Sequence, residues 1–246
     1  MCAICGIFNP SGIDDQAVHH LSQMRDAMTH RGPDDAGIYR DANVVLGARR
    51  LSIIDLEGGH QPISNVVGTV WVVLNGEIYN FRELRQELES KGHRFRSRCD
   101  TEVVVHLYEE EGAQCLKRLR GMFAVALWDK KNRRLLLARD RMGIKPLYYA
   151  WRDQALLFAS ELKGLQKHPE IRPLLDLKSV DQYLLLGYVP TPGCILRNVS
   201  KLPPGHFLTV EKNRCELTAY WQAPPPGKSR TISEGEAATQ VQDAVS

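Results

Sequence analysis

The segment Cys2-Ala3-Ile4-Cys5-Gly6-Ile7-Phe8 opens the chain after Met1, and the turn residues Asn9-Pro10-Ser11-Gly12 follow it directly. Ile4 to Phe8 predict a short buried strand, which the turn cluster ends. A helix is expected between Asp14 and Thr29, where apolar residues recur on one helical face. The chain is therefore expected to begin with a buried strand followed by a packed helix.

The rest of the chain continues this alternation of strands and helices. A helix is expected from Asn80 to Gly92, with Asn80 and Glu83 as a capping box. The segment from Asp100 to Gly112 could be a helix or a strand, and its apolar spacing favours a helix. Strands joined by short polar turns, with helices inserted, predict an α+β fold with antiparallel sheets. The expected strands are 37–40, 44–48, 69–74 (ending at the turn dipeptide Asn75-Gly76), 122–128, 134–138, 147–150 and 155–159.

Composition and charge exclude several classes of protein. The 246 residues are 43% hydrophobic and 25% charged, as in ordinary soluble globular chains, which excludes disorder and fibrous repeats. The net charge of +3 is too small and too mixed for a nucleic-acid binder. No apolar run approaches the ~18 residues of a membrane span. We expect neither a nucleic-acid nor a membrane partner.

The six cysteines do not form a disulfide scaffold in a chain of this length. No secretion signal is recognisable at the N-terminus, so a reducing, cytoplasmic location is expected. Cys2 and Cys5 have the spacing of half a zinc site or of a redox pair, but no second ligand pair follows in the sequence. His30, His93 and His106 show no ligand spacing, so no metal site is expected.

Cys2 carries the chemistry that the sequence suggests most directly. Removal of Met1 would leave a thiol and a free α-amine on one residue. The amine has an intrinsic pKa of about 7.7–8.0 and the thiol one of about 8.5, so the amine can accept the thiol's proton near neutral pH. This is the arrangement of an N-terminal nucleophile, in which the α-amine is the base. The alternative is that a cysteine stands at this position by accident.

Ten short motifs follow one another along the chain: Cys2–Phe8, His30–Asp34, Arg50–Asp55, Asn75–Asn80, Asp100–Glu102, Gly121–Ala124, Arg139–Tyr149, Phe158–Lys163, Gly187–Pro190 and Lys201–His206. In this order they resemble the class II glutamine amidotransferase (Ntn-hydrolase) domain, and most of all the glutaminase domain of glutamine-hydrolysing asparagine synthetases. The resemblance covers residues 1–221.

The resemblance implies a four-layer αββα sandwich of two antiparallel sheets with helices outside. It also implies that Cys2 attacks the side-chain amide of L-glutamine, releasing glutamate and ammonia. Asn75 and the N–H of Gly76 would form the oxyanion hole. The substrate-binding residues implied by the resemblance are Arg50 for the α-carboxylate, Glu77 and Asp100 for the α-ammonium, and Ile53.

Each of these residues also has a plainer interpretation. Arg50 could be an ordinary surface charge, as Arg49 beside it could be. Asn75-Gly76 could be only a hairpin turn. Asp100 could only cap the helix that it begins. Two positions depart from the family pattern: Ala3 replaces a glycine, which is tolerable if its φ is negative, and Cys5 replaces a small apolar residue.

Residues 222–246 are expected to be a Pro-rich linker and the truncated start of a synthetase domain. The ammonia would pass to such a domain or subunit, which would use ATP, Mg²⁺ and aspartate, whereas the glutaminase reaction needs no cofactor. A homodimer is a further expectation. Two other interpretations remain: an amidotransferase for another acceptor, such as phosphoribosylpyrophosphate or fructose 6-phosphate, and a degenerate, non-catalytic regulatory module.

Overall fold

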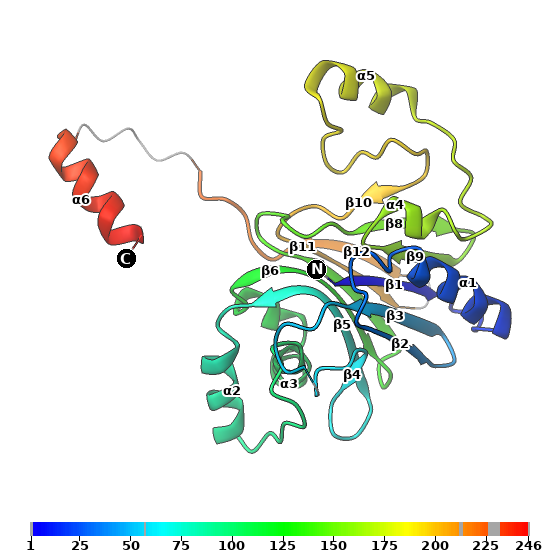
Figure 1. Cartoon of the computed structure of the whole chain (residues 1–246), viewed down its shortest axis with the longest axis horizontal. Coiled ribbons are helices and arrows are strands. Elements are labelled where there is room, and N and C mark those ends of the chain that lie inside the picture. The colour runs from blue at the N-terminus through cyan, green and yellow to red at the C-terminus, as the bar shows by residue number, and fades with distance from the viewer. Residues whose placement is uncertain (1, 57, 212–213, 226–231, 246) are drawn as a thin grey trace.

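Strand β1 (Ala3–Phe8) lies inside a six-stranded antiparallel sheet, and all six of its residues are buried. The computed structural model (Figure 1) describes residues 2–56, 58–211, 214–225 and 232–245. Sheet A has the strand order β10-β8-β9-β1-β3-β2. Its other strands are β2 (Asp35–Arg40), β3 (Val44–Arg50), β8 (Tyr148–Arg152), β9 (Ala155–Ala159) and β10 (Ser200–Lys201).

Sheet B is also antiparallel and has six strands, in the order β12-β11-β7-β6-β5-β4. Its longest pair, β5 and β6, is in register from Val70 opposite Asp129 to Ile78 opposite Gly121. The strands are β4 (Ile63–Ser64), β5 (Val70–Ile78), β6 (Gly121–Asp129), β7 (Arg134–Arg139), β11 (His206–Glu211) and β12 (Arg214–Ala219).

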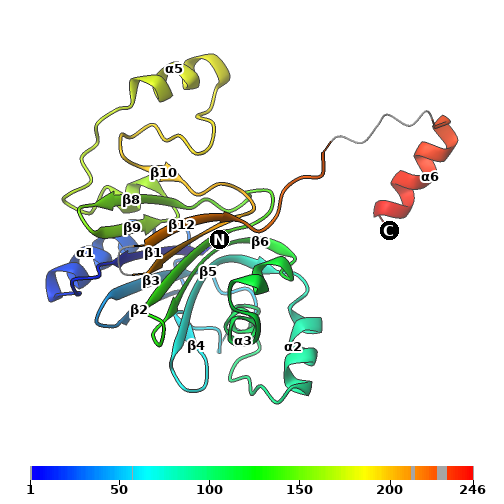
Figure 2. The ribbon, with the colours of Figure 1, turned by 180° about the vertical axis from the view of Figure 1, so that it is seen from behind.

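The two sheets pack face to face, and helices cover their outer faces (Figures 1 and 2). One apolar cluster fills the space between the sheets, with Phe8 from sheet A against Trp128 from sheet B. A second cluster joins sheet A to α1 (Asp15–Asp26) and α4 (Leu162–Leu165). A third joins sheet B to α2 (Phe81–Ser90) and α3 (Thr101–Glu111). The predicted four-layer αββα sandwich is confirmed.

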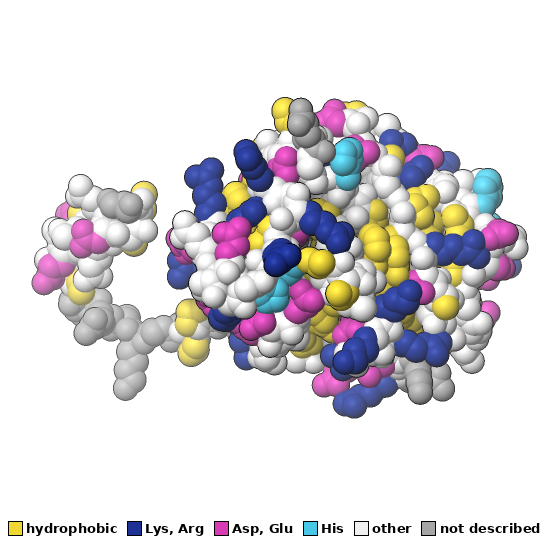
Figure 3. All heavy atoms as spheres, turned by 90° about the horizontal axis from the view of Figure 1, so that it is seen from below, with side chains coloured by type: hydrophobic (Ala, Val, Ile, Leu, Met, Phe, Trp, Pro, Cys, Tyr) yellow, Lys and Arg dark blue, Asp and Glu magenta, His cyan; other side chains and the backbone are white. Residues whose placement is uncertain are grey.

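Three further elements complete the described chain: a 3₁₀ helix η1 (Gly112–Lys117), α5 (Leu177–Leu186) and α6 (Glu234–Val245). Helix α6 buries none of its residues. Gln222 to Pro225 form no helix or strand, and residues 226–231, into which the predicted linker continues, lie outside the described residues. On the face shown in Figure 3, basic side chains are interspersed with acidic ones. No helix within the described ranges is both long and apolar enough to cross a membrane.

Two local predictions were wrong. The strand predicted to end at 74 continues through Asn75-Gly76 to Ile78, because β6 pairs with it over this whole length. Asn80 precedes α2, but its side chain makes no cap. Instead its Nδ2 donates to the Arg118 carbonyl and its Oδ1 accepts from the Arg120 N–H. These two hydrogen bonds connect the start of α2 to the segment before β6.

Candidate functional site

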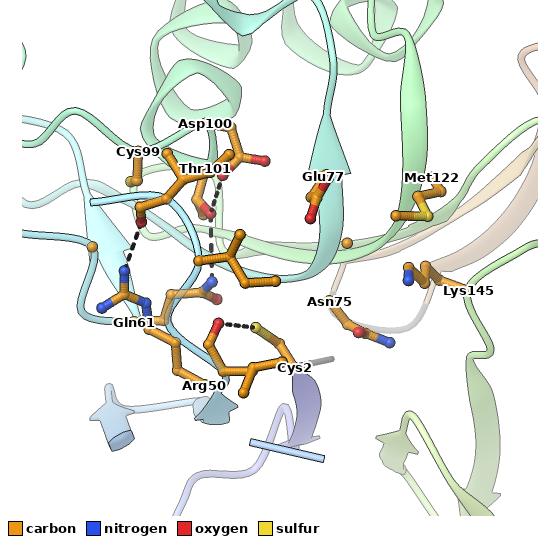
Figure 4. A pocket seen from close by; sticks show the side chains of 15 residues that line it. Cys2, Arg50, Gln61, Asn75, Glu77, Cys99, Asp100, Thr101, Met122 and Lys145 are labelled. Carbon is orange, nitrogen blue, oxygen red and sulfur yellow. Dashed lines mark hydrogen bonds between the residues drawn. The ribbon is translucent and has the colours of Figure 1, made fainter. Parts of the chain in front are cut away.

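All seven residues expected in the site line one pocket between the ends of the two sheets (Figure 4). They come from distant parts of the sequence: Cys2 precedes β1, Arg50 ends β3, and Asp100 precedes α3. The pocket is lined by Cys2, Arg50, Ile53, Asn75, Gly76, Glu77 and Asp100, together with Leu51, Ile54, Gly59, Gln61, Cys99, Thr101, Met122 and Lys145.

Cys2 is held at the pocket by its backbone. The Arg31 guanidinium donates to the Cys2 carbonyl at 2.9 Å and also pairs with Glu161 at 2.9 Å. The Cys2 Sγ itself lies 3.8 Å from the Leu51 carbonyl oxygen. Burial raises the pKa of the Cys2 thiol above its ordinary value. The thiol therefore needs a base to become a nucleophile near neutral pH.

The two cysteines of the CxxC spacing do not form a pair. Cys5 is fully buried among the side chains between sheet A and α1, where burial raises the pKa of its thiol to about 12. Cys2 instead lines the pocket, and residues of odd and even number in a strand point to opposite faces. Ala3 is not among the non-glycine residues of positive φ in the described ranges, so it fits the extended strand.

Asn75 is fully buried, and neither oxygen nor nitrogen of its side-chain amide has a hydrogen-bond partner. Such a group costs about 1–3 kcal/mol when it stays unpaired. In Figure 4 its side chain lies on the same side of the pocket as Cys2, away from Asp100 and Glu77. The arrangement leaves an amide N–H₂ available to a bound group.

The Gly76 N–H points to the edge of β5 that faces away from β6. The Leu74 N–H donates to Gln61 Oε1 at 2.7 Å, and the Ile78 N–H donates to Asp100 Oδ2 at 2.8 Å. Because N–H directions alternate along an antiparallel strand, the Gly76 N–H also points away from β6, between these two acceptors. The alternative that Asn75-Gly76 only forms a turn is thereby excluded.

Arg50 is 5% exposed, so it is not an ordinary surface charge. Its Nη2 donates to the carbonyls of Ile54 (2.9 Å) and Asp55 (2.6 Å), and its Nη1 approaches that of Leu56 at 3.4 Å. Each edge of a guanidinium that can grip a carboxylate with two parallel bonds includes an Nη2 hydrogen. A bidentate grip therefore requires Nη2 to release one of these carbonyls.

Asp100 and Glu77 supply the negative charge of the pocket. Burial raises the pKa of the Asp100 carboxyl, and the charge of Glu77 raises it further. Asp100 makes no side-chain cap on α3, so the capping interpretation was wrong. Ile53 is 61% exposed and lies at the rim.

Sequence reasoning missed Gln61 and Lys145, which also line the pocket. Gln61 links β5 to α3, because its Nε2 donates to Thr101 Oγ1 at 3.4 Å while its oxygen binds Leu74. Lys145 is 4% exposed and follows Asp140, whose carboxylate accepts four backbone N–H groups and shapes the loop. Lys145 lies inside the motif Arg139–Tyr149, whereas no local sequence pattern marks Gln61.

Comparisons with known proteins identify the family. A model of the glutamine amidotransferase domain matches residues 1–221. The chain is 37% identical over 224 residues to "Asparagine synthetase [glutamine-hydrolyzing] 3" of Bacillus subtilis, covering 90% of this chain and 36% of that protein. It is 39% identical over 251 residues to "Asparagine synthetase [glutamine-hydrolyzing] 1" of the same organism, covering 100% and 39%. The chain thus spans less than two fifths of the length of these relatives.

The fold also matches a solved structure. Glutamine phosphoribosylpyrophosphate amidotransferase of B. subtilis superposes with a TM-score of 0.64 at 18% identity, covering 90% of this chain and 50% of that one. This likeness confirms the sandwich architecture. The family model over residues 1–221 shows that the chain belongs to the class II glutamine amidotransferase domain family.

Proposed function

We propose that this domain hydrolyses L-glutamine to glutamate and ammonia, with Cys2 as the nucleophile. The observation that carries the proposal is the Asn75 amide, which is fully buried, lacks any partner and lines the same pocket as Cys2. A protein that only needed a packed core would gain by replacing this side chain with an apolar one. An unpaired amide in the same pocket as a thiol is what stabilisation of an oxyanion requires.

The chemistry proceeds in two steps. The Cys2 thiolate attacks the carbonyl carbon of the glutamine side chain, and the oxyanion that forms accepts hydrogen bonds from the Asn75 amide and the Gly76 N–H. The C–N bond then breaks, and the nitrogen leaves as ammonia after taking up a proton. Water attacks the resulting glutamyl thioester, which releases glutamate and returns the thiol.

The base is the α-amine of Cys2 itself, once Met1 has been removed. Burial raises the pKa of the thiol, so few thiolates form without a base. An α-amine titrates at about 7.7–8.0 and stands on the same residue. It can take the thiol's proton and return it to the departing ammonia.

The pocket is suited to the α-amino acid end of the substrate. Glu77 and Asp100 supply two carboxylates for the α-ammonium, and Arg50 supplies a buried cation for the α-carboxylate. Ile53 closes the exposed side as an apolar rim residue. These opposite charges favour a zwitterionic amino acid over a simple amide.

The ammonia would pass to a synthetase domain or subunit, as the similarity to glutamine-hydrolysing asparagine synthetases suggests. ATP, Mg²⁺ and aspartate would be used there, and the glutaminase step would need no cofactor. In this division, residues 1–221 form the glutaminase domain and residues 222–246 lead into the synthetase part. Association as a homodimer belongs to the same proposal.

Two cysteine variants test the nucleophile. Cys99 also lines the pocket, so Cys99→Ala is the matched control for Cys2→Ala. Cys2→Ala should lose glutamate release while keeping glutamine binding, because the charged residues that bind the α-amino acid group remain. Cys99→Ala should retain most of its turnover. Turnover by Cys2→Ala would refute the proposal, and loss of turnover in Cys99→Ala alone would make Cys99 the nucleophile.

The N-terminus is tested separately by intact-mass measurement. An active preparation should have the mass of a chain beginning at Cys2. Full activity in protein that retains Met1 would refute the α-amine as base while leaving the thiol as nucleophile.

A further inference from the structure

Outside the pocket, three possible metal ligands converge beside α3. They are His93, in the segment between α2 and α3, and His106 and Glu109, on α3 itself. His93 Nδ1 lies 3.1 Å from His106 Nδ1, which lies 2.9 Å from Glu109 Oε2, and His93 Nδ1 is 3.8 Å from that oxygen. None of the three lines the glutamine pocket.

These separations suit one metal ion. Zinc bound at about 2.0–2.1 Å by nitrogen or oxygen in a tetrahedron places its ligand atoms about 3.3 Å apart. The three observed separations, from 2.9 to 3.8 Å, bracket this value. The Glu109 side chain is 28% exposed and that of His93 is 15% exposed, so an ion has a route from solvent. A water molecule would complete the coordination on this open side.

Without a metal ion, the three atoms have to share a single proton. An ionised Glu109 has no hydrogen to donate, and two imidazole N–H groups cannot face each other. At most one proton can therefore lie among the three atoms. Carried by His106 Nδ1, it would be shared between two acceptors, His93 Nδ1 and Glu109. A cation accepts all three lone pairs at once.

Two of the three ligands are also oriented by a hydrogen bond to a second group, as metal ligands in proteins usually are. His93 Nε2 lies 2.9 Å from Glu110 Oε1. Glu109 Oε1 accepts from the Nδ2 of the buried Asn65 at 2.7 Å. His106 Nε2 is buried without a partner, 3.7 Å from Glu102 Oε1. Metal bound at Nδ1 would place the proton of His106 on Nε2, where it faces this carboxylate.

We propose that His93, His106 and Glu109 bind one divalent transition-metal ion of the zinc type. The ion would join the segment before α3 to α3 itself, on the side of sheet B where α2 and α3 lie together (Figures 1 and 2). The sequence did not indicate this site, because His93 and His106 are 13 residues apart and meet only when the segment folds back on α3. The proposal is independent of the glutaminase reaction.

Zinc titration of the full chain tests the proposal. The Cys2→Ala background is used, because an N-terminal cysteine can chelate zinc by its amine and thiol. Competition against a chromophoric chelator should give one equivalent of Zn²⁺ per chain, and Zn²⁺ should raise the melting temperature relative to EDTA. Co²⁺ in the same site should give the visible absorption of a low-coordinate nitrogen and oxygen site.

Matched variants decide whether these residues hold the ion. Glu109→Gln and His93→Ala should abolish the binding of one Zn²⁺ per chain and the shift in melting temperature. Both side chains are partly exposed, and unfolding of each variant without metal checks that the fold persists. Glu110→Gln should weaken binding by about 10–100-fold, as loss of an orienting partner does. His19→Ala, at an exposed histidine of α1, should bind as tightly as its parent. Undiminished binding in Glu109→Gln, or no saturable binding in the parent, would overturn the proposal.

Discussion

The Asp100 carboxylate accepts the backbone N–H of Ile78 at 2.8 Å and makes no capping hydrogen bond to the helix that it precedes. The acid is thus attached to β5, the strand that carries Asn75, Gly76 and Glu77. One contact connects the residues proposed for the α-ammonium with those proposed for the oxyanion. The contact fixes the position of Asp100 and opposes the rise in its pKa, which burial causes.

Asp100→Asn should keep this contact and lose the charge. The amide oxygen of asparagine can still accept the Ile78 N–H, so the fold should persist. A charge-assisted hydrogen bond is worth about 1.5–3 kcal/mol, so kcat/KM for glutamine should fall by about 10–150-fold. Unchanged kinetics would show that Asp100 does not contact the α-ammonium.

The same variant has a distinctive pH dependence. A carboxyl whose folded pKa is raised holds its proton more tightly in the folded state, so the wild-type protein loses stability as pH rises from the unfolded pKa to the folded one. Asp100→Asn lacks this loss. Denaturant unfolding should be measured from pH 3 upward. The unfolding free energy of the variant should rise relative to that of the wild type until the pH passes the raised pKa, and the difference should then stay constant. A gap that does not vary with pH would contradict the raised pKa.

Asn75→Ala should separate activity from stability. No protein group loses a hydrogen bond, because the Asn75 amide has none, so the melting temperature should fall little or rise. The kcat should fall by about 10²–10³ with little change in KM, as when an oxyanion donor is removed.

Asn65→Ala is the matched control, because Asn65 is an equally buried asparagine that hydrogen-bonds Thr69, Val70 and Glu109. It should be strongly destabilised, since each partner left unpaired costs about 1–3 kcal/mol. Similar losses of stability in the two variants would mean that the Asn75 amide has a structural partner in solution.

The sequence was sufficient for the parts of the fold whose burial follows a simple pattern. β1 is buried on both faces and is a continuous apolar run. The β6–β7 hairpin has polar residues at its turn and, apart from Arg139 at the far end of β7, none along its strands. No element was predicted in the region that holds α5. There Leu184 is 78% exposed and Leu185 81%, so its apolar residues mark no buried face. Apolar periodicity predicts a helix or strand only where the apolar residues form a buried face, and those of α5 form none.

The motifs predicted which residues form the site. They could not predict how these residues are arranged in space. Residue types at Cys2, Arg50 and Asp100 suggested roles, and the fold brings these residues into one pocket. That Asp100 would bind Ile78 rather than its own helix depends on where β5 passes α3. Gln61 enters the pocket for the same reason. Contacts between distant segments have no local signal in a sequence.

Gly76→Ala should damage the strand itself. Gly76 has φ +151°, and an added Cβ would stand 2.0 Å from the Met122 carbonyl oxygen of the neighbouring strand. β5 and β6 would have to separate at the site, so we expect large losses of stability and turnover. Gly68→Ala is the control, because Gly68 has φ +70° with nothing within 4 Å of the added Cβ. It should cost only the backbone strain of about 1–3 kcal/mol. Equal unfolding free energies for the two variants would contradict the steric argument.

Arg50→Lys should impair both substrate binding and the loop that follows β3. The Arg50 guanidinium fits against Gly59, whose added Cβ would lie 2.3 Å from Nη2, and it holds the carbonyls of Ile54 and Asp55. A lysine has one ammonium and cannot bind a carboxylate with two parallel bonds, whereas Arg50 can do so once Nη2 releases one of these carbonyls. KM for glutamine should rise by about 10–150-fold, and the amides of residues 51–56 and 58–59 should exchange faster with solvent. Arg49→Lys is the control, because Arg49 pairs with Asp26 at 2.7 Å, outside the pocket, and should leave KM unchanged. A normal KM in Arg50→Lys would mean that a positive charge suffices there, and that the planar guanidinium serves the loop rather than the substrate.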